Sequence, residues 1–167
     1  GSAVGHSRGL VSRRGAMPSD VLAVTGLLGA SAAGYLILKQ GLRVQGGGKL
    51  VKLFSYPLPR LKQMHAISRL VHSATDLSDG LVIGAYNLCA GCGVVIDERL
   101  VPYASGIDFV GTKLGKSNFE LASIGCDYEL LLSIPREKFS EAKKLVEKTG
   151  CSLTEIGVFS NEKKVVL

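Results

Sequence analysis

Two acidic side chains stand three positions apart in the segment ATDLSDG at positions 74–80. The segment separates a short extended run from an expected helix, so the carboxylates of Asp76 and Asp79 can point at one spot. Hard oxygen ligands of this kind bind Mg²⁺, with water and substrate phosphate in the remaining positions, and a helix start attracts anions. Acidic residues are also common as helix caps and in first turns. The spacing therefore predicts either a magnesium site or a capped helix, with Ser78 assisting.

A glycine-bearing turn lies in the segment GLLGASAAG at positions 26–34, between an expected strand and an expected helix. Small residues at Gly26 and Gly29 let a phosphate or a neighbouring domain approach the backbone closely. The segment is not a Walker loop, because the lysine of that motif is missing. Phosphate binding and structural packing both remain open for these two glycines.

A polar cluster, SIGCDYE at positions 123–129, comes directly before the apolar strand expected at 130–134. Side chains at the entrance of a strand can line a site, and a solvent-exposed turn is the alternative. Of the four cysteines, only Cys89 and Cys92 are closely spaced. A structural zinc site needs a second ligand pair at similar spacing, so we expect these thiols to be reduced and to bind no metal.

The composition is that of one soluble domain with a core, since 46% of the 167 residues are hydrophobic and 20% are charged. The net charge of +6 favours an anionic partner such as a nucleotide or a phosphorylated metabolite. Nucleic acid is disfavoured, because the basic residues are scattered and there is no Trp. The apolar stretch at 21–38 is interrupted by Thr and Gly residues, which favours a strand, a turn and a helix over a membrane span. With no signal peptide recognised, the expected compartment is the cytoplasm.

Short apolar runs bounded by Gly, Pro or polar turns predict strands at 21–25, 94–96, 129–134 and 153–159, the last paired with 164–167. Helical spacing predicts helices at 30–40, 60–71, 79–90 and 137–148, whereas Gly46–Gly48 indicates a flexible turn and 98–120 is rich in loops. These elements predict an α/β (α+β) sandwich, in which helices flank a central mixed β-sheet. Residues 1–15 are expected to form a flexible lead-in and residues 16–167 a single domain.

Five segments together resemble the C-terminal half of thiamine-monophosphate kinase, a family in the superfamily of aminoimidazole ribonucleotide synthetase. In chain order they are SRRGAMPSD at 12–20, VTG at 24–26 with SAAG at 31–34, PLPR at 57–60, DLSDGL at 76–81, and Gly125 with DYEL at 127–130. The segment DLSDGL is the most specific of them. The resemblance covers nearly the whole chain.

The resemblance implies Mg²⁺-dependent transfer of the γ-phosphate of ATP to thiamine monophosphate, giving thiamine diphosphate without a covalent enzyme intermediate. By the same resemblance, Asp79 and Asp76 hold Mg²⁺, and Asp79 and Ser78 are catalytic. Ser78, Arg60, Gly26 and Gly29 are the cofactor-binding candidates. Asp127 and Tyr128 are the candidates for the substrate side of the cleft.

The sequence departs from the family pattern at Ala30, where the family has Asp, at Cys126, where it has Glu, and at Ile124, where it has Gly. The family's N-terminal ATP-binding domain, with its own acidic motif, is not recognised here. We therefore expect the chain to be inactive alone, to need that missing domain, and to form a homodimer in the full-length protein. The alternative is a divergent, non-catalytic domain that serves ligand binding or assembly.

Overall fold

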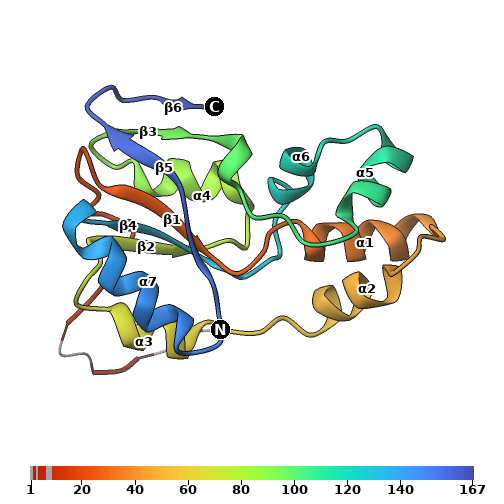
Figure 1. Ribbon diagram of the computed structural model, residues 1–167, viewed down its shortest axis with the longest axis horizontal. Coiled ribbons are helices and arrows are strands. Elements are labelled where there is room, and N and C mark those ends of the chain that lie inside the picture. Colours follow the sequence, from red (N-terminus) through yellow and green to blue (C-terminus); the bar gives the residue numbers. More distant parts are fainter. Residues whose placement is uncertain (1, 3, 7–8) are drawn as a thin grey trace.

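The computed structural model describes residue 2, residues 4–6 and residues 9–167 (Figure 1). The strands are β1 (Val21–Thr25), β2 (Ser73–Asp76), β3 (Gly93–Ile96), β4 (Leu130–Ile134), β5 (Leu153–Ser160) and β6 (Val165–Val166). The α-helices are α1 (Ala30–Gln40), α2 (Gly47–Ser55), α3 (Leu61–Ile67), α4 (Leu81–Leu88), α5 (Ile107–Leu114), α6 (Asn118–Ala122) and α7 (Phe139–Glu147). Short 3₁₀ turns occur at Glu98–Leu100 and Arg136–Lys138.

The described strands form one sheet in the order β2-β4-β1-β5-β3-β6. All neighbours are antiparallel except β3 and β6, which are parallel. Helices cover both faces of this sheet, as Figure 1 shows, with α4 on one side and α3 and α7 on the other. The predicted sandwich with a central mixed sheet is confirmed.

The apolar run of β1 reflects its central position in the sheet. Leu22 and Val24 pack in the cluster that includes α4, whereas Val21 and Ala23 pack in the cluster that includes α3 and α7. Successive side chains of a strand point to opposite faces, so a strand covered on both faces is apolar throughout. All five residues of β1 are buried.

A second group of helices, α1, α2, α5 and α6, lies beyond one end of the sheet (Figure 1). Buried residues of α1, α2, α5 and α6 share one cluster, which includes Ala33, Leu50, Val110 and Leu121. Gly34 lets α1 and α2 approach closely, because a Cβ there would lie 2.3 Å from the carbonyl oxygen of Leu50. The chain enters this group directly from β1, so the turn between β1 and α1 sits at the junction of sheet and helices.

The stretch at 21–38 is a strand, a turn and a helix, as predicted. No helix in the described part of the chain combines the length and apolar character that a membrane crossing needs. Gly41 ends α1 with a left-handed φ of 63°, the conformation that glycine adopts at low cost. The expected helix at 60–71 is shorter, because the chain turns after Ile67 to enter β2.

Two local predictions were wrong. Gly46–Gly48 is not a free turn, because Gly46 precedes α2 and the other two glycines form its first turn. The predicted pairing of 153–159 with 164–167 does not occur, since β5 already lies between β1 and β3. The C-terminal segment instead adds to β3, where Val94 donates its N–H to the carbonyl of Lys164 at 2.8 Å. The loop-rich stretch at 98–120 contains α5, which spacing did not reveal.

The prediction of a flexible lead-in at 1–15 falls in part on residues 1, 3, 7 and 8, which lie outside the described residues. Its end is attached to the sheet, because Ala74 of β2 donates its N–H to the carbonyl of Ser12 at 3.0 Å. This bond places the lead-in alongside β2.

Candidate functional site

Two motif loops that are far apart in the sequence pack against each other. One is the loop 76–80, between β2 and α4, and the other is the loop 125–129, before β4. Leu77 donates its N–H to the carbonyl of Glu129 at 2.8 Å, and Cys126 donates to the carbonyl of Ser78 at 2.9 Å. The sheet causes this meeting, because β2 and β4 are antiparallel neighbours and the two loops continue from the same end.

The contact between the loops requires glycine at two points. Gly80 has φ 92° and Gly125 has φ 108°, values that side-chain-bearing residues rarely adopt. A Cβ at Gly80 would lie 2.2 Å from the carbonyl oxygen of Ser123, and one at Gly125 would lie 2.3 Å from that of Ser78. Cys126 and Tyr128 also have positive φ, 66° and 53°. Such strained backbone persists where the surroundings fix it, and it clusters at functional sites.

The carboxylates of Asp76 and Asp79 are both exposed at this junction. Neither has a hydrogen bond or an ion pair with a residue that the structure describes. The capping interpretation is wrong, because the residue before α4 is Gly80 and no side chain caps the helix. Both carboxylates are therefore available to an external ligand.

The donor set fits Mg²⁺, which keeps several waters and uses one or two carboxylates together with substrate phosphate. No group of three His, Cys, Asp or Glu in the described residues could hold a metal by itself. Asp76 and Asp79 would thus be the protein ligands, with water and phosphate oxygens completing the shell. Ser78 is half-buried between them in the chain, with its carbonyl bonded to Cys126.

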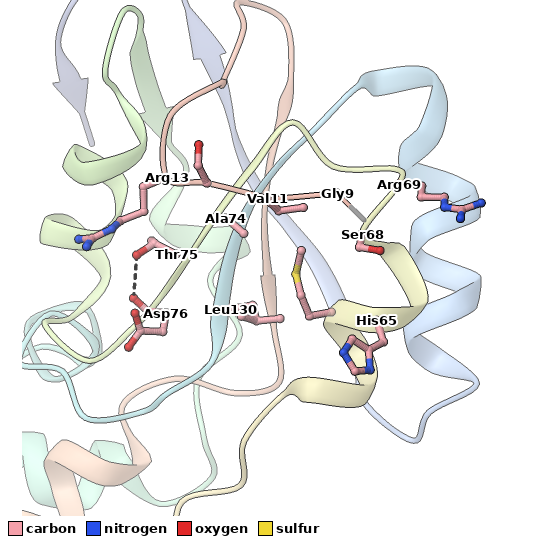
Figure 2. A pocket seen from close by; sticks show the side chains of 12 residues that line it. Gly9, Val11, Arg13, His65, Ser68, Arg69, Ala74, Thr75, Asp76 and Leu130 are labelled. Carbon is pink, nitrogen blue, oxygen red and sulfur yellow. Dashed lines mark hydrogen bonds between the residues drawn. The ribbon is translucent and has the colours of Figure 1, made fainter. Parts of the chain in front are cut away.

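Asp76 also lines a cavity of about 870 Å³ (Figure 2). The cavity lies between the lead-in, α3 and β2. Figure 2 shows Arg13 and Asp76 toward one end of it and His65 and Arg69 toward the other. Because Asp76 lines this cavity, there is room for a ligand next to the candidate magnesium site.

A second cavity, of about 260 Å³, lies where the sheet meets the helix group. Its walls include the apolar side chains of Leu27, Leu53 and Leu58. Its polar residues include Arg60, Asp127 and Glu129, and Gly26 and Ser31 also line it. The loop 125–129 therefore contacts the loop 76–80 through its backbone while two of its carboxylates line this cavity.

Asp127 binds the start of α1. One carboxylate oxygen accepts the N–H of Gly29 at 2.7 Å, and the other accepts the N–H of Ser31 at 3.0 Å. Burial raises the pKa of Asp127 to about 6, and the charge of Glu129 adds to the effect, while the bonds from Gly29 and Ser31 oppose it. The N–H groups of Gly29 and Ser31 are thus already occupied at the turn where the sequence left phosphate binding open.

Arg60 and Glu129 form an ion pair that closes one side of the second cavity. The Nε of Arg60 donates to Glu129 Oε2 at 2.6 Å, and its Nη2 donates to Oε1. The hydrogen bonds to Glu129 raise the pKa of Arg60. Thr25 donates its hydroxyl to the same carboxylate at 2.6 Å and accepts the N–H of Leu130 at 2.8 Å. Glu129 therefore ties the end of β1 to the loop before α3.

Gly26 and Gly29 are explained by packing. A Cβ at Gly26 would lie 2.2 Å from the carboxylate of Glu129, and one at Gly29 would lie 2.8 Å from Ile107 Cδ1. Both have positive φ, 62° and 85°. Packing accounts for both glycines without a bound phosphate, and their predicted role in cofactor binding stays a prediction.

The structure separates the predicted site residues into two groups. Asp76, Ser78, Asp79 and Tyr128 belong to the two packed loops, with Tyr128 donating its N–H to the carbonyl of Leu77 at 3.3 Å. The remaining predicted residues line or border the second cavity; they are Gly26, Gly29, Arg60 and Asp127.

Sequence reasoning missed Glu129 and Thr25 as site residues. The available signal was a lone carboxylate at the start of an otherwise apolar strand, since a buried charge requires a partner. The same reasoning also missed the place of Arg13 in the first cavity, because a lead-in carries no pattern that predicts where it docks.

Cys89 and Cys92 both carry free thiols. Burial raises the pKa of Cys89 to about 11, and the neighbouring Cys92 adds to the increase. A high thiol pKa disfavours the thiolate that metals bind. The absence of metal at this pair stays a prediction, tested by elemental analysis of the purified protein for zinc.

Comparison with known proteins gives the family. Residues 17–167 match the family described as AIR synthase related protein, C-terminal domain. The thiamine-monophosphate kinase of Escherichia coli strain K12 is 36% identical over 152 residues, covering 88% of this chain and 46% of that protein. The chain thus spans about half the length of the curated relatives it matches.

Solved structures agree with this assignment. AaThiL in complex with AMPPCP and TMP superposes with a TM-score of 0.81 at 27% identity, covering 95% of this chain and 50% of that one. The thiamine-monophosphate kinase of Stenotrophomonas maltophilia K279a is 23% identical and shares the fold, with a TM-score of 0.84 over 93% of this chain and 52% of that one. The chain therefore belongs to the family of AIR synthase related proteins, as a C-terminal domain.

Proposed function

We propose that this chain is the C-terminal half of an ATP-dependent kinase that converts thiamine monophosphate to thiamine diphosphate. One observation supports the proposal above the others: two exposed carboxylates, without partners among the residues that the structure describes, stand where two strained motif loops meet. The similarity to thiamine-monophosphate kinases, and a relative's complex with AMPPCP, an analogue of ATP, support the choice of substrates.

In this proposal, Asp76 and Asp79 hold Mg²⁺ through exposed carboxylate oxygens. The ion, when bound, neutralises charge on the phosphates. The hydroxyl of Ser78 binds a phosphate oxygen, and the loop backbone keeps the three residues in place. Phosphoryl transfer needs little covalent chemistry from the protein, so these residues act by positioning and electrostatics.

Asp127 and Tyr128 lie on the substrate side of the cleft. Their loop is held to Asp76–Gly80 by backbone hydrogen bonds, so that a substrate held by one loop is positioned against the other. Arg60 is the candidate phosphate-binding residue of the family resemblance, and both its Nε and its Nη2 already donate to Glu129.

We further propose that the chain does not turn over by itself, and that the part of its relatives lying outside the matched half supplies further Mg²⁺ and ATP contacts. A homodimer of the longer protein, in the cytoplasm, belongs to the same proposal. Ala30 and Cys126, which replace the family's acidic residues, favour the second candidate, a non-catalytic module for ligand binding or assembly.

A coupled assay distinguishes the two candidates. Thiamine diphosphate formation is measured from thiamine monophosphate, ATP and Mg²⁺, with this chain alone and with a longer form that carries the other half. We expect product only from the longer form. A longer form that binds the substrates and makes no thiamine diphosphate would establish the non-catalytic module instead.

A further inference from the structure

A third cavity, of about 450 Å³, lies at the C-terminal end of α4. Three segments form its walls: the lead-in, the end of α4 with the turn that follows it, and the residues that lead into β6. Its charged lining residues are Arg14, Lys163 and Lys164, and two thiols, those of Cys89 and Cys92, also line it. Cavities of this size hold small molecules.

This cavity is separate from the candidate magnesium site. Asp79 lies just before α4 and Cys89 lies just after it, and the eight residues of the helix span roughly 12 Å. Two successive residues of the lead-in also belong to different cavities, because Arg13 lines the first and Arg14 lines the third. The proposed phosphoryl transfer therefore does not use the third cavity.

The lining of the third cavity is strongly positive. Arg14, Lys163 and Lys164 bring three positive charges, and none of the lining residues is Asp or Glu. The three side chains are exposed, and no carboxylate in the described part of the chain lies within ion-pair distance of them. The negative end of the dipole of α4 offsets about half a charge, so an excess of about two and a half positive charges remains.

The two thiols do not reduce this charge. Burial raises the pKa of Cys89 to about 11 and also raises the pKa of Cys92, so both groups are neutral near pH 7. The charge of Asp20 contributes to the raised pKa of Cys92. Asp20 is itself buried, however, and its carboxylate is already bonded to His72 and Ser133.

The backbone around the cavity is held in place on two sides. A Cβ at Gly93 would collide with the carbonyl oxygens of Glu162 and Lys164, so the turn before β6 packs directly on β3. On the other side, the Sγ of Cys92 lies 3.6 Å from the carbonyl oxygen of Ala16 in the lead-in. A ligand would therefore meet cations that extend from an ordered backbone, which lowers the entropy cost of binding.

We propose that the third cavity is a binding site for a small polyanion that carries phosphate groups. The guanidinium of Arg14 can bind two phosphate oxygens at once, and Lys163 and Lys164 act as point charges. The amide of Asn87 and the hydroxyl of Tyr86 add hydrogen-bond donors at the helix end. A phosphate group directs its oxygens in several directions and can meet donors from all three walls, whereas a carboxylate is planar.

Inorganic pyrophosphate is the probe, titrated into the chain at constant ionic strength while backbone amide signals are followed by NMR. We expect saturable shifts at 14, 86–92 and 163–165, with a dissociation constant on the order of 1 mM or below. Citrate, a polyanion without phosphate, is titrated in parallel and should bind at least about threefold more weakly.

Charge-removing variants locate the site. Arg14→Gln should weaken pyrophosphate binding about fivefold, and Lys163→Gln combined with Lys164→Gln should weaken it about tenfold. All three side chains are exposed, so these changes leave the core intact. Lys113→Gln is the matched control, because it removes one charge from an exposed lysine of α5 that lines none of the three cavities. It should change the affinity by less than about twofold.

Four results would overturn the inference: a dissociation constant above about 10 mM, tighter binding of citrate than of pyrophosphate, equal weakening by Lys113→Gln and Arg14→Gln, or saturable shifts confined to 65–76. The last result would place the anion in the first cavity. These titrations use neither ATP nor thiamine monophosphate, so their outcome is independent of the kinase assignment.

Discussion

Asp127 shows how the role of a single residue depends on its surroundings. Its position in the motif DYEL predicted a site residue, and the structure brings it to the second cavity. Its bonds to Gly29 and Ser31 could not be predicted, because they join segments nearly one hundred positions apart and depend on how the loops pack. A motif specifies the residue type, whereas tertiary packing decides which lone pairs remain free.

The raised pKa of Asp127 predicts a pH dependence of stability. Its pKa is about 6 in the folded chain, against 3.8 for the unperturbed group. Because the folded pKa is the higher one, this carboxyl contributes stability that is fully present below about pH 4 and is lost as pH rises to about 6. Asp127→Asn removes the titration. The free energy of unfolding is measured by urea denaturation at pH 4 and at pH 7. Between these pH values the parent should lose on the order of 2 kcal/mol that the variant keeps.

A difference between the two proteins that does not change between these pH values would contradict this account of Asp127. The comparison with the variant is essential, since other acidic groups also titrate over this range and affect both proteins equally.

The ion pair of Glu129 with Arg60 predicts a loss of stability that depends on both residues. Glu129→Gln removes the charge that pairs with Arg60 and leaves a partly buried guanidinium without its partner. We expect a loss of about 2 kcal/mol in the free energy of unfolding, and a smaller loss when Arg60→Leu is made in the same chain. A double-mutant cycle measures the coupling, and additive effects of the two substitutions would show that the pair contributes no stability.

Elements were predicted better than their connections. Buried strands such as β1 and β4 are short apolar runs that end at Gly or Pro, so their existence follows from local sequence. The strand that pairs with the C-terminal segment does not follow from local sequence. β5 lies between β1 and β3 and has no free edge, so β6 pairs with the free edge of β3. Similarly, α2 begins with glycines, and its packing on α1 overrides their low helix propensity.

In the candidate site, too, the local elements could be predicted from sequence and the contact between them could not. DLSDGL was identified as a strand-to-helix junction, and the structure confirms that β2 precedes it and α4 follows it. Its contact with the loop 125–129 could not be derived from spacing, because it depends on β2 and β4 being neighbours in the sheet.

The packing of the two loops predicts the effect of a single methyl group. Gly125→Ala would place its Cβ 2.3 Å from the carbonyl oxygen of Ser78, at a φ of 108°. We expect a loss of about 2 kcal/mol or more in unfolding free energy, together with weaker Mn²⁺ binding at Asp76 and Asp79, because the loop that carries them must move. Manganese-induced broadening of amide signals at 76–80 provides the binding measurement.

Gly115→Ala is the matched control, since Gly115 also has a positive φ, 62°, but a Cβ there meets nothing within 4 Å. It should cost about 1 kcal/mol and leave Mn²⁺ binding unchanged. If both variants lose the same stability and both keep the ion, the contact between the loops does not support the site.

At the scale of the whole molecule, the fold and the family could be predicted from the sequence, whereas the positions of the first and second cavities could not. The sheet brings the loop that carries the exposed carboxylates against the loop 125–129, and Asp127 and Glu129 of that second loop line the second cavity. The chain spans about half the length of its curated relatives, such as the Escherichia coli kinase, of which it covers 46%. The proposed reaction is therefore tested in a longer form.

The central claim is that Asp79 binds Mg²⁺ for phosphoryl transfer. The decisive measurement is thiamine diphosphate formation at limiting Mg²⁺ by the longer form with Asp79→Asn, together with its melting temperature. The side chain of Asp79 is exposed and caps no helix, so the substitution should change stability by roughly 1 kcal/mol or less, a few degrees in melting temperature. Turnover should fall by about two orders of magnitude, because the amide replaces the anionic oxygen that Mg²⁺ prefers. Full turnover of the Asp79→Asn enzyme at limiting Mg²⁺ would contradict the account.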